Sequence, residues 1–301
     1  MAACDNRSSA MGADGIGGCM IDYLETLPNQ TKLSSDICIV GAGPAGISIA
    51  KELIDSGLSV IVLESGDFEF EAATQKLYAG RVLENLPPEP LDVSRLRFFG
   101  GSSNCWSGSC GPFDPVDFKP RTWITDSGWP LARDDLHGYY KRAHALIGLG
   151  PYDYRVSSWT NDDWDLFDMS GTDVMNIARQ KNLQRFGPEY QADLENADNI
   201  QVIFHANLTA IRTNEALNHV TAVEATTLGG ESITVEARKT VLACSGVGNA
   251  RLLLAFGFGE KLPALKTGVR SRFSLIYHLT ALESGIGRVI PASNLLSNVW
   301  N

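Results

Sequence analysis

Residues 36–66, DICIVGAGPAGISIAKELIDSGLSVIVLESG, decide the fold of this chain. The apolar residues of 37–40 predict a short buried strand, and residues 47–53 have the spacing of an amphipathic helix. The β-branched run 60–63 predicts a second strand that ends at an acidic residue. A strand, a helix and a second strand in this order form a βαβ unit, which predicts an α/β fold with a parallel sheet.

Three glycines with G-x-G-x-x-G spacing connect the first strand to the helix: Gly41, Gly43 and Gly46. Gly41 allows a tight turn, Gly43 has no Cβ to keep a pyrophosphate from the backbone, and Gly46 lets helix and strand pack closely. The helix N-terminus behind them presents unpaired N–H groups and the positive end of the helix dipole. This arrangement predicts a phosphate-binding turn.

Glu64 stands eighteen positions beyond Gly46, at the end of the second strand. A carboxylate there can accept hydrogen bonds from a ribose, and it would repel a 2′-phosphate, which argues against NADP. A glycine triplet alone is a weak signal, because ordinary loop glycines also match it. Since two strands, a helix and an acid stand in register with it, we predict a dinucleotide site.

The composition is that of a soluble globular protein, because 44% of the 301 residues are hydrophobic and 20% are charged. The length suggests two domains or one large one. The net charge of -10 argues against nucleic acid as a partner. The sequence has no C-x-x-C pair, no export signal and no run approaching ~18 apolar residues. We therefore expect a cytoplasmic enzyme without a bound metal or a transmembrane segment.

A second glycine-rich stretch, residues 95–112, reads RLRFFGGSSNCWSGSCGP. Its backbone can press against a flat ligand while Ser102, Ser103 and Asn104 offer hydrogen bonds. A Gly/Ser-rich surface linker is the alternative interpretation, but the aromatic residues make the stretch too apolar for a solvated linker. We predict a ligand-binding loop.

The later sequence returns to strand patterns, over residues 200–204, 208–212 and 220–227. Gly229 and Gly230 form a hairpin turn into residues 232–237, which predicts an antiparallel ribbon.

Residues 240–254, TVLACSGVGNARLLL, carry another apolar strand into a glycine turn and a helix. This strand is expected beside the first βαβ unit, where it would help to close the site. Arg251 is either a partner of the pyrophosphate or a solvated helix arginine. Residues 190–197 are expected to be a polar connection.

Together these motifs resemble the glucose-methanol-choline family of flavin oxidoreductases, in particular its bacterial sugar, gluconate and polyol dehydrogenases and the pyranose oxidases. The resemblance covers about residues 35–260. It rests on the first glycine motif with Glu64, on residues 97–108, on 127–131 with Asp135-Leu136 and Tyr139-Tyr140, and on 243–254.

The resemblance implies FAD as the cofactor, with its pyrophosphate at the first glycine turn and the ribose of its adenosine half at Glu64. Residues 100–104 would line the isoalloxazine and the ribityl chain, and the Leu208 backbone would meet the adenine. FAD fits better than NAD, because a nicotinamide enzyme has no use for the second glycine loop. The predicted cofactor-binding residues are Gly41, Gly43, Pro44, Ala45, Gly46, Glu64, Ser65, Arg97, Gly100, Gly101, Ser102, Ser103, Asn104, Cys105, Trp106, Leu208, Ser245 and Gly246.

The expected architecture is a doubly wound, Rossmann-like FAD-binding α/β domain with an inserted, incomplete substrate domain. Its expected parts are a flexible N-terminal arm (1–33), the first part of the FAD-binding domain (34–112), a substrate-domain or lid insertion (113–195), the second part of the FAD-binding domain (196–260) and the start of a truncated substrate domain (261–301).

The second glycine loop departs from the family at one position. Where pyranose oxidases carry a histidine that bonds covalently to the flavin, this chain has Cys105. The flavin is then held either without a covalent bond or through the Cys105 thiol.

A second departure concerns the catalytic base, so no catalytic residue is assigned. In the family, the base that takes the hydroxyl proton while a hydride passes to flavin N5 is a histidine, paired with a histidine or asparagine near the end of a longer chain. Residues 269–279 faintly resemble a family segment that precedes this pair. None of the histidines, His137, His144, His205, His219 and His278, matches the pair itself.

The resemblance implies an FAD-dependent oxidoreductase that acts on the CH-OH group of an alcohol, sugar or polyol. A small-molecule alcohol or sugar substrate and an electron-acceptor protein are its candidate partners. Because the base is missing, the chain could also be an inactive fragment, or a non-catalytic FAD-binding module that receives its base from a partner chain. An NAD-dependent dehydrogenase or a flavin monooxygenase would need a second glycine fingerprint, which the sequence lacks.

Overall fold

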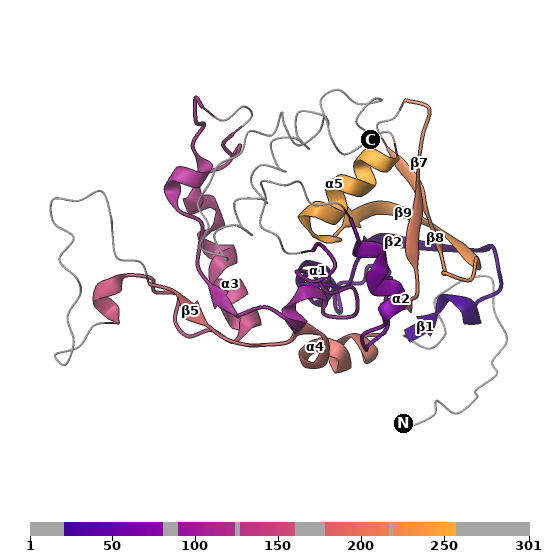
Figure 1. Ribbon diagram of the computed structural model, residues 1–301, viewed down its shortest axis with the longest axis horizontal. Helices are drawn as coiled ribbons and strands as arrows, with labels where there is room; N and C mark the ends of the chain where they lie inside the picture. Colours follow the sequence, from indigo (N-terminus) through magenta and orange to yellow (C-terminus); the bar gives the residue numbers. More distant parts are fainter. Residues whose placement is uncertain (1–20, 81–89, 124–126, 160–177, 217–218, 257–301) are drawn as a thin grey trace.

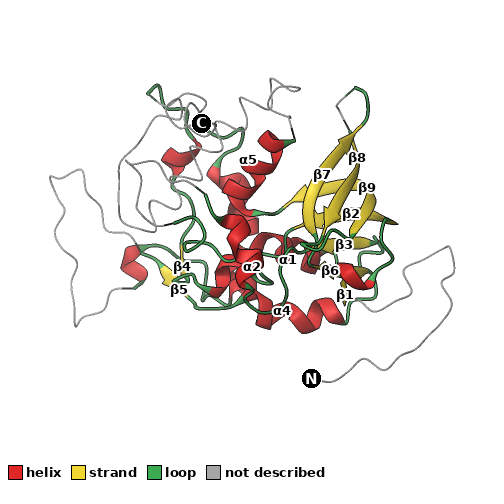
Figure 2. Ribbon diagram, turned by 45° about the vertical axis from the view of Figure 1, so that its right-hand side comes forward, coloured by secondary structure: helices red, strands yellow, loops and turns green. Residues whose placement is uncertain are grey.

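The largest sheet of the described chain has seven strands, in the order β1-β6-β3-β2-β9-β8-β7 (Figures 1 and 2). The computed structural model describes residues 21–80, 90–123, 127–159, 178–216 and 219–256. Neighbours pair in parallel from β1 to β9, and the β9-β8 and β8-β7 pairs are antiparallel. The strands are β1 (Ile21–Tyr23), β2 (Thr31–Val40), β3 (Val60–Leu63), β6 (Ile200–Phe204), β7 (Asn207–Thr213), β8 (Val220–Thr226) and β9 (Ser232–Leu242).

The other described elements are helices, short 3-10 helices and a second, two-stranded sheet. The helices are α1 (Pro44–Glu52), α2 (Ala72–Gln75), α3 (His137–Ile147), α4 (Phe186–Glu195) and α5 (Ser245–Ala255). Short 3-10 helices span Leu24–Thr26 (η1), Lys76–Tyr78 (η2), Gly101–Asn104 (η3), Pro115–Phe118 (η4), Arg133–Leu136 (η5) and Val156–Ser158 (η6). Strands β4 (Ser109–Cys110) and β5 (Gln180–Lys181) form a separate antiparallel pair.

The predicted βαβ unit is confirmed. β2 leads through the glycine turn into α1, and β3 returns parallel to β2 with Ile37 opposite Val60. All residues of β3 are buried, as expected for a strand that is covered on both faces. The helix begins earlier than predicted because Pro44 occupies its first turn, where a missing N–H costs nothing.

The N-terminal part of the described chain differs from expectation. The sequence assigns residues 21–33 to a flexible arm, but β1 pairs with β6 at the sheet edge and β2 already begins at Thr31. A hydrogen bond of 2.6 Å from Gln201 Nε2 to Asp22 Oδ2 joins β1 to β6. Because a strand of three residues is too short to show a periodic pattern, its pairing could not be predicted from the sequence.

Strands β7, β8 and β9 form the predicted antiparallel ribbon. β9 continues beyond the ribbon and pairs in parallel with β2, up to Val40 opposite Leu242. This pairing brings the end of β9 and the start of α5 beside the first glycine turn, which confirms the predicted neighbourhood.

Helix α4 covers most of residues 190–197, for which the sequence predicts a polar connection. Phe186, Tyr190 and Leu194 recur every fourth residue and are buried. They pack into the same core as residues of α1. The helix therefore forms because one apolar face covers the sheet.

The core occupies both faces of the sheet. Ile39 and Val62 pack on the face that α1 and α4 cover. Their strand neighbours Cys38 and Ile61 point to the opposite face, which the ribbon strands help to bury. An α/β fold with a mixed, mostly parallel sheet is thus confirmed, and it is consistent with a Rossmann-like FAD-binding domain. The domain boundaries and the inserted substrate domain stay predictions.

Within the described residues, no helix combines the length and the apolar character that a membrane crossing requires.

Phe204 tests this packing, because its side chain is fully buried between the rings of Tyr23, Phe68 and Phe99. Phe204→Ala should lower the free energy of unfolding by about 3–5 kcal/mol. Phe70→Ala is the control, because this phenylalanine is 55% exposed; its effect should stay within about 0.5 kcal/mol. Urea unfolding followed by circular dichroism measures both, and equal effects would contradict the assigned core.

Candidate cofactor site

The first glycine turn is closed by backbone contacts that exclude side chains. Gly41 has a φ of +101°, and its N–H donates to Leu63 O at 2.7 Å. A Cβ on Gly41 would lie 2.8 Å from Ala243 O, and one on Gly46 would overlap the Gly41 carbonyl oxygen. The turn therefore requires glycine where β2, α1 and the end of β9 meet.

The N-terminus of α1 is open where a phosphate would bind. Gly43 is the N-cap and no side chain caps this end, so the first N–H groups of the helix have no side-chain partner. A Cβ on Gly43 would meet only Gly101 Cα, at 3.9 Å. The missing side chain leaves free space in front of the helix dipole, which fits the pyrophosphate of a dinucleotide.

The second glycine loop packs directly on the first. The Gly100 N–H donates to Ala42 O at 2.8 Å. Gly101 has a φ of +53°, and a Cβ there would lie 3.0 Å from Gly43 Cα. The two predicted motifs, far apart in the sequence, thus form one continuous backbone surface at the end of β2.

Polar side chains of the second loop hold its own shape. Ser103 Oγ donates to Gly100 O at 2.6 Å and accepts from the Phe186 N–H at 3.0 Å. Asn104 Nδ2 donates to Phe99 O at 2.9 Å. The predicted contacts of these side chains with a cofactor stay predictions.

The other side chains of this loop also contact protein. Ser102 Oγ accepts from the Leu96 N–H at 3.2 Å, and the indole N–H of Trp106 donates to Gln184 O at 2.9 Å. Cys105 is exposed. The sequence offered no sign that α4 and its approach anchor the loop.

Glu64 joins β3 to the first turn. Its carboxylate is buried; Oε2 accepts from the Ala42 N–H at 2.7 Å. Oε1 accepts from the Gly66 N–H at 3.0 Å and from Ser65 Oγ at 3.2 Å. The acid predicted for a ribose therefore also fixes the turn, and carboxylate oxygens can accept further hydrogen bonds.

Arg97 brings an unsatisfied donor to the same region. Its Nη2 donates to Asn207 Oδ1 at 3.3 Å, and its guanidinium lies 5.0 Å from the ring centre of Tyr78. Its Nε is buried and has no hydrogen-bond partner among the described residues. A buried donor without a partner is costly in a finished structure, so Arg97 fits a site for an anionic ligand.

The β9–α5 turn completes the site. Burial, followed by the charge of Glu64, raises the pKa of the Cys244 thiol to about 12, while the charge of Arg97 opposes this shift. The end of β9 therefore lies within electrostatic reach of both side chains.

Ser245, the first residue of α5, has a φ of +69°, which is unusual for a residue other than glycine. Asn249 supports this turn, since its Oδ1 accepts from the Cys244 N–H at 2.9 Å and its Nδ2 donates to Leu242 O at 2.8 Å. Sequence reasoning missed Asn249, although an asparagine just inside a helix after a glycine turn is typical of such local bonding.

The β6–β7 turn packs against the Glu64 segment, and the predicted adenine contact, Leu208, follows this turn as the second residue of β7. The Ala206 N–H donates to Glu64 O at 2.9 Å and the His205 N–H donates to Gly66 O at 3.3 Å. The turn thus continues the β3–β6 pairing past the strand ends.

The histidines in the described chain have structural surroundings. His144 is buried and both ring nitrogens have partners, His137 packs on an aromatic ring, and His219 is exposed. His205 contacts two carboxylates, and His278 lies outside the described residues. In the described ranges, no three metal-ligating side chains form a group that could hold a metal ion.

A family model described as DAO, FAD dependent oxidoreductase, matches residues 36–291. The chain belongs to this FAD-dependent oxidoreductase family. Its cofactor is therefore FAD, as predicted, and the open helix end, Glu64 and the unpartnered Arg97 donor fit that cofactor.

A 2-methyl-1,2-propanediol dehydrogenase from Mycolicibacterium austroafricanum is 26% identical over 135 residues, which cover 38% of this chain and 24% of the dehydrogenase. A crystal structure of formate oxidase is 17% identical and matches with a TM-score of 0.49 over 77% of this chain and 48% of the oxidase. A variant of the Aspergillus oryzae formate oxidase is 15% identical, with a TM-score of 0.45. The chain spans about a quarter of the dehydrogenase and about half of the oxidase.

Gly43→Ala separates folding from cofactor binding. The added methyl group has room in the protein, so the free energy of unfolding should change by less than about 1 kcal/mol. The same methyl group would stand where the pyrophosphate approaches, so the Kd for FAD should rise about tenfold or more.

Gly138→Ala is the matched control, because a Cβ on Gly138 would meet nothing within 4 Å and Gly138 lies in α3. It should leave the Kd for FAD unchanged, as measured by flavin fluorescence titration of the apoprotein. Equal FAD affinity of the Gly43→Ala variant and the parent protein would contradict the assigned phosphate position.

Proposed function

We propose that the chain is the FAD-binding portion of a glucose-methanol-choline oxidoreductase that acts on the CH-OH group of an alcohol, sugar or polyol. The observation that carries this proposal is the contact between the two glycine loops, from the Gly100 N–H to Ala42 O at 2.8 Å. A nicotinamide enzyme needs only the first loop. A flavin nucleotide has two ends to hold, and the paired loops supply a surface for both.

Each residue of the site has a role in this proposal. The N–H groups behind Gly43 donate to the pyrophosphate, and Glu64 accepts from a ribose hydroxyl. Arg97 supplies its free Nε donor to the nucleotide, and loop residues 100–104 support the flavin ring. FAD, when bound, supplies the two-electron acceptor for oxidation of the substrate.

Support for the substrate class comes from the name of the propanediol dehydrogenase, which indicates an alcohol as its substrate. Its match with this chain covers 24% of that protein, so an alcohol substrate is a proposal for this chain.

The surroundings of His144 and His205 favour a second candidate function, in which the base that takes the substrate proton comes from elsewhere. Among the described residues, His144 has partners on both nitrogens and His205 lies between Glu25 and Glu71. Neither is free to take a proton from a substrate hydroxyl. A base supplied by a partner chain would make this protein an FAD-binding module, the second candidate.

Arg97→Met should weaken FAD binding about tenfold, because a hydrogen bond to a charged group contributes about 1.5–3 kcal/mol. Arg238→Met is the control; this exposed arginine pairs with Asp36 away from the site. FAD titration of both apoproteins measures the effect, and matching affinities would argue against Arg97 as a nucleotide contact.

Anaerobic mixing of the FAD-loaded protein with a panel of alcohols, sugars and polyols tests the activity. Loss of the visible flavin absorbance is expected with a CH-OH donor. Tight FAD binding without any loss of absorbance would favour the binding module instead, and failure to bind FAD would contradict both candidates.

A further inference from the structure

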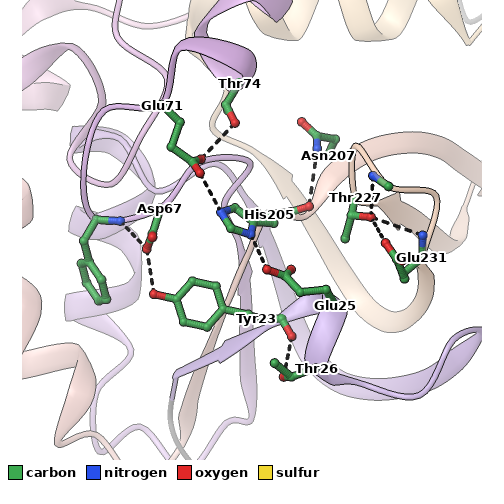
Figure 3. Close-up of polar contacts among 12 residues, drawn as sticks. Tyr23, Glu25, Thr26, Asp67, Glu71, Thr74, His205, Asn207, Thr227 and Glu231 are labelled. Carbon is green, nitrogen blue, oxygen red and sulfur yellow. Dashed lines mark hydrogen bonds and ion pairs between the residues drawn. The ribbon is translucent and has the colours of Figure 1, made fainter. Parts of the chain in front are cut away.

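His205 occupies the turn between β6 and β7 (Figure 3), and the backbone of this turn bonds to the segment that carries Glu64. Its backbone has a φ of +55°, a left-handed conformation that histidine adopts more often than most residues. Its N–H donates to Gly66 O at 3.3 Å, and the next N–H, of Ala206, donates to Glu64 O at 2.9 Å. The position of this turn therefore sets the position of the segment that carries Glu64.

The imidazole lies between two carboxylates from different elements. Nδ1 is 2.7 Å from Glu25 Oε1, in η1, and Nε2 is 3.3 Å from Glu71 Oε1, just before α2. The second contact is an ion pair without the alignment of a hydrogen bond. A neutral imidazole has a single N–H, so its other nitrogen would point a lone pair at a carboxylate. Only the imidazolium suits both neighbours.

The other charged and titratable groups that face His205 are Tyr23, from β1, and Asp67, after β3. The Tyr23 ring lies 5.4 Å from the imidazole, and its hydroxyl donates to Asp67 Oδ1 at 2.8 Å. Burial, followed by the hydrogen bond to Asp67, raises the pKa of Tyr23 to about 12, so this phenol stays neutral. Protonation of His205 therefore decides the charge balance of the cluster.

These contacts also shift the pKa of His205. Burial by itself lowers the pKa of His205, but the hydrogen bond to Glu25 and the charges of Glu25, Glu71 and Asp67 outweigh burial and raise the pKa above its ordinary value of 6.5. The stabilisation is complete below about pH 6.5 and is lost as the pH rises through the raised pKa. Above it, three carboxylates face a neutral ring.

The turn reaches the cofactor site through a further side chain. Asn207 Nδ2 donates to the His205 carbonyl oxygen at 3.4 Å, and its Oδ1 accepts from Arg97 Nη2 at 3.3 Å. Glu64 and Arg97 are thus both tied to the turn that His205 holds.

We propose that His205 is a positioning residue: as an imidazolium clasped by Glu25 and Glu71, it holds the Glu64 and Arg97 side of the cofactor site in its binding arrangement. FAD therefore binds more tightly at slightly acidic pH than at alkaline pH. This inference rests on the proposed contacts of Glu64 and Arg97 with FAD.

The test is the Kd for FAD of the apoprotein, measured by flavin fluorescence from about pH 6 to about pH 9. His205→Asn removes the charge, and asparagine tolerates the left-handed backbone. The Kd of the parent protein should rise about fivefold across this range, while that of His205→Asn stays high throughout. Exposed His219 provides the control, since His219→Asn should follow the parent protein. Titration of FAD itself affects all three proteins equally, and parallel profiles for the parent and His205→Asn would overturn the proposal.

A second variant covers a folding defect in His205→Asn. Glu71→Gln keeps the histidine but removes one carboxylate, so the rise in Kd should shift to lower pH. A rise at the same pH as in the parent protein would contradict the role of Glu71 in holding the imidazolium.

Failure of the parent protein to bind FAD at any pH would contradict the proposed function. Thermal unfolding of the apoproteins then tests whether protonated His205 is held between Glu25 and Glu71. The difference in Tm between the parent and His205→Asn should shrink as the pH rises, and a difference independent of pH would contradict the role of the proton.

Discussion

The structure depends on the direct backbone contact between its two glycine loops. The Gly100 N–H donates to Ala42 O, and Gly101 approaches Gly43 so closely that a Cβ on Gly101 would lie 3.0 Å from Gly43 Cα. One hydrogen bond of this kind contributes only about 1 kcal/mol, so its importance is geometric. It fixes the second loop in front of the N-terminus of α1, and the proposed FAD site uses both loops for this reason.

Glu64 extends this constraint to the rest of the sheet. Its carboxylate accepts from the N–H groups of Ala42 and Gly66, and its backbone continues the pairing of β3 with β6. On the other side, β9 pairs with β2 along its whole length and ends against Gly41. The carboxyl ends of four parallel strands therefore meet at one edge, which is where open α/β sheets bind their ligands.

The sequence predicted the parts of the fold that have a strong local pattern, namely the β2–α1–β3 unit, the ribbon and the return of β9. Helix α4 was missed because Gly187 and Pro188 look like helix breakers, although proline is tolerated in a first helical turn. Among the site residues, the glycines and Glu64 follow a spacing rule, which made them predictable. The contact of His205 with Glu25 joins residues that are 180 positions apart, and no local pattern encodes such a contact.

Hydrogen–deuterium exchange of the apoprotein with and without FAD tests most directly whether both loops bind one cofactor. The account predicts slower amide exchange on addition of FAD in peptides from residues 41–46 and in peptides from residues 100–106, with the same dependence on FAD concentration. Protection of the first loop alone would contradict a shared flavin site, and no protection in either loop would contradict the site altogether.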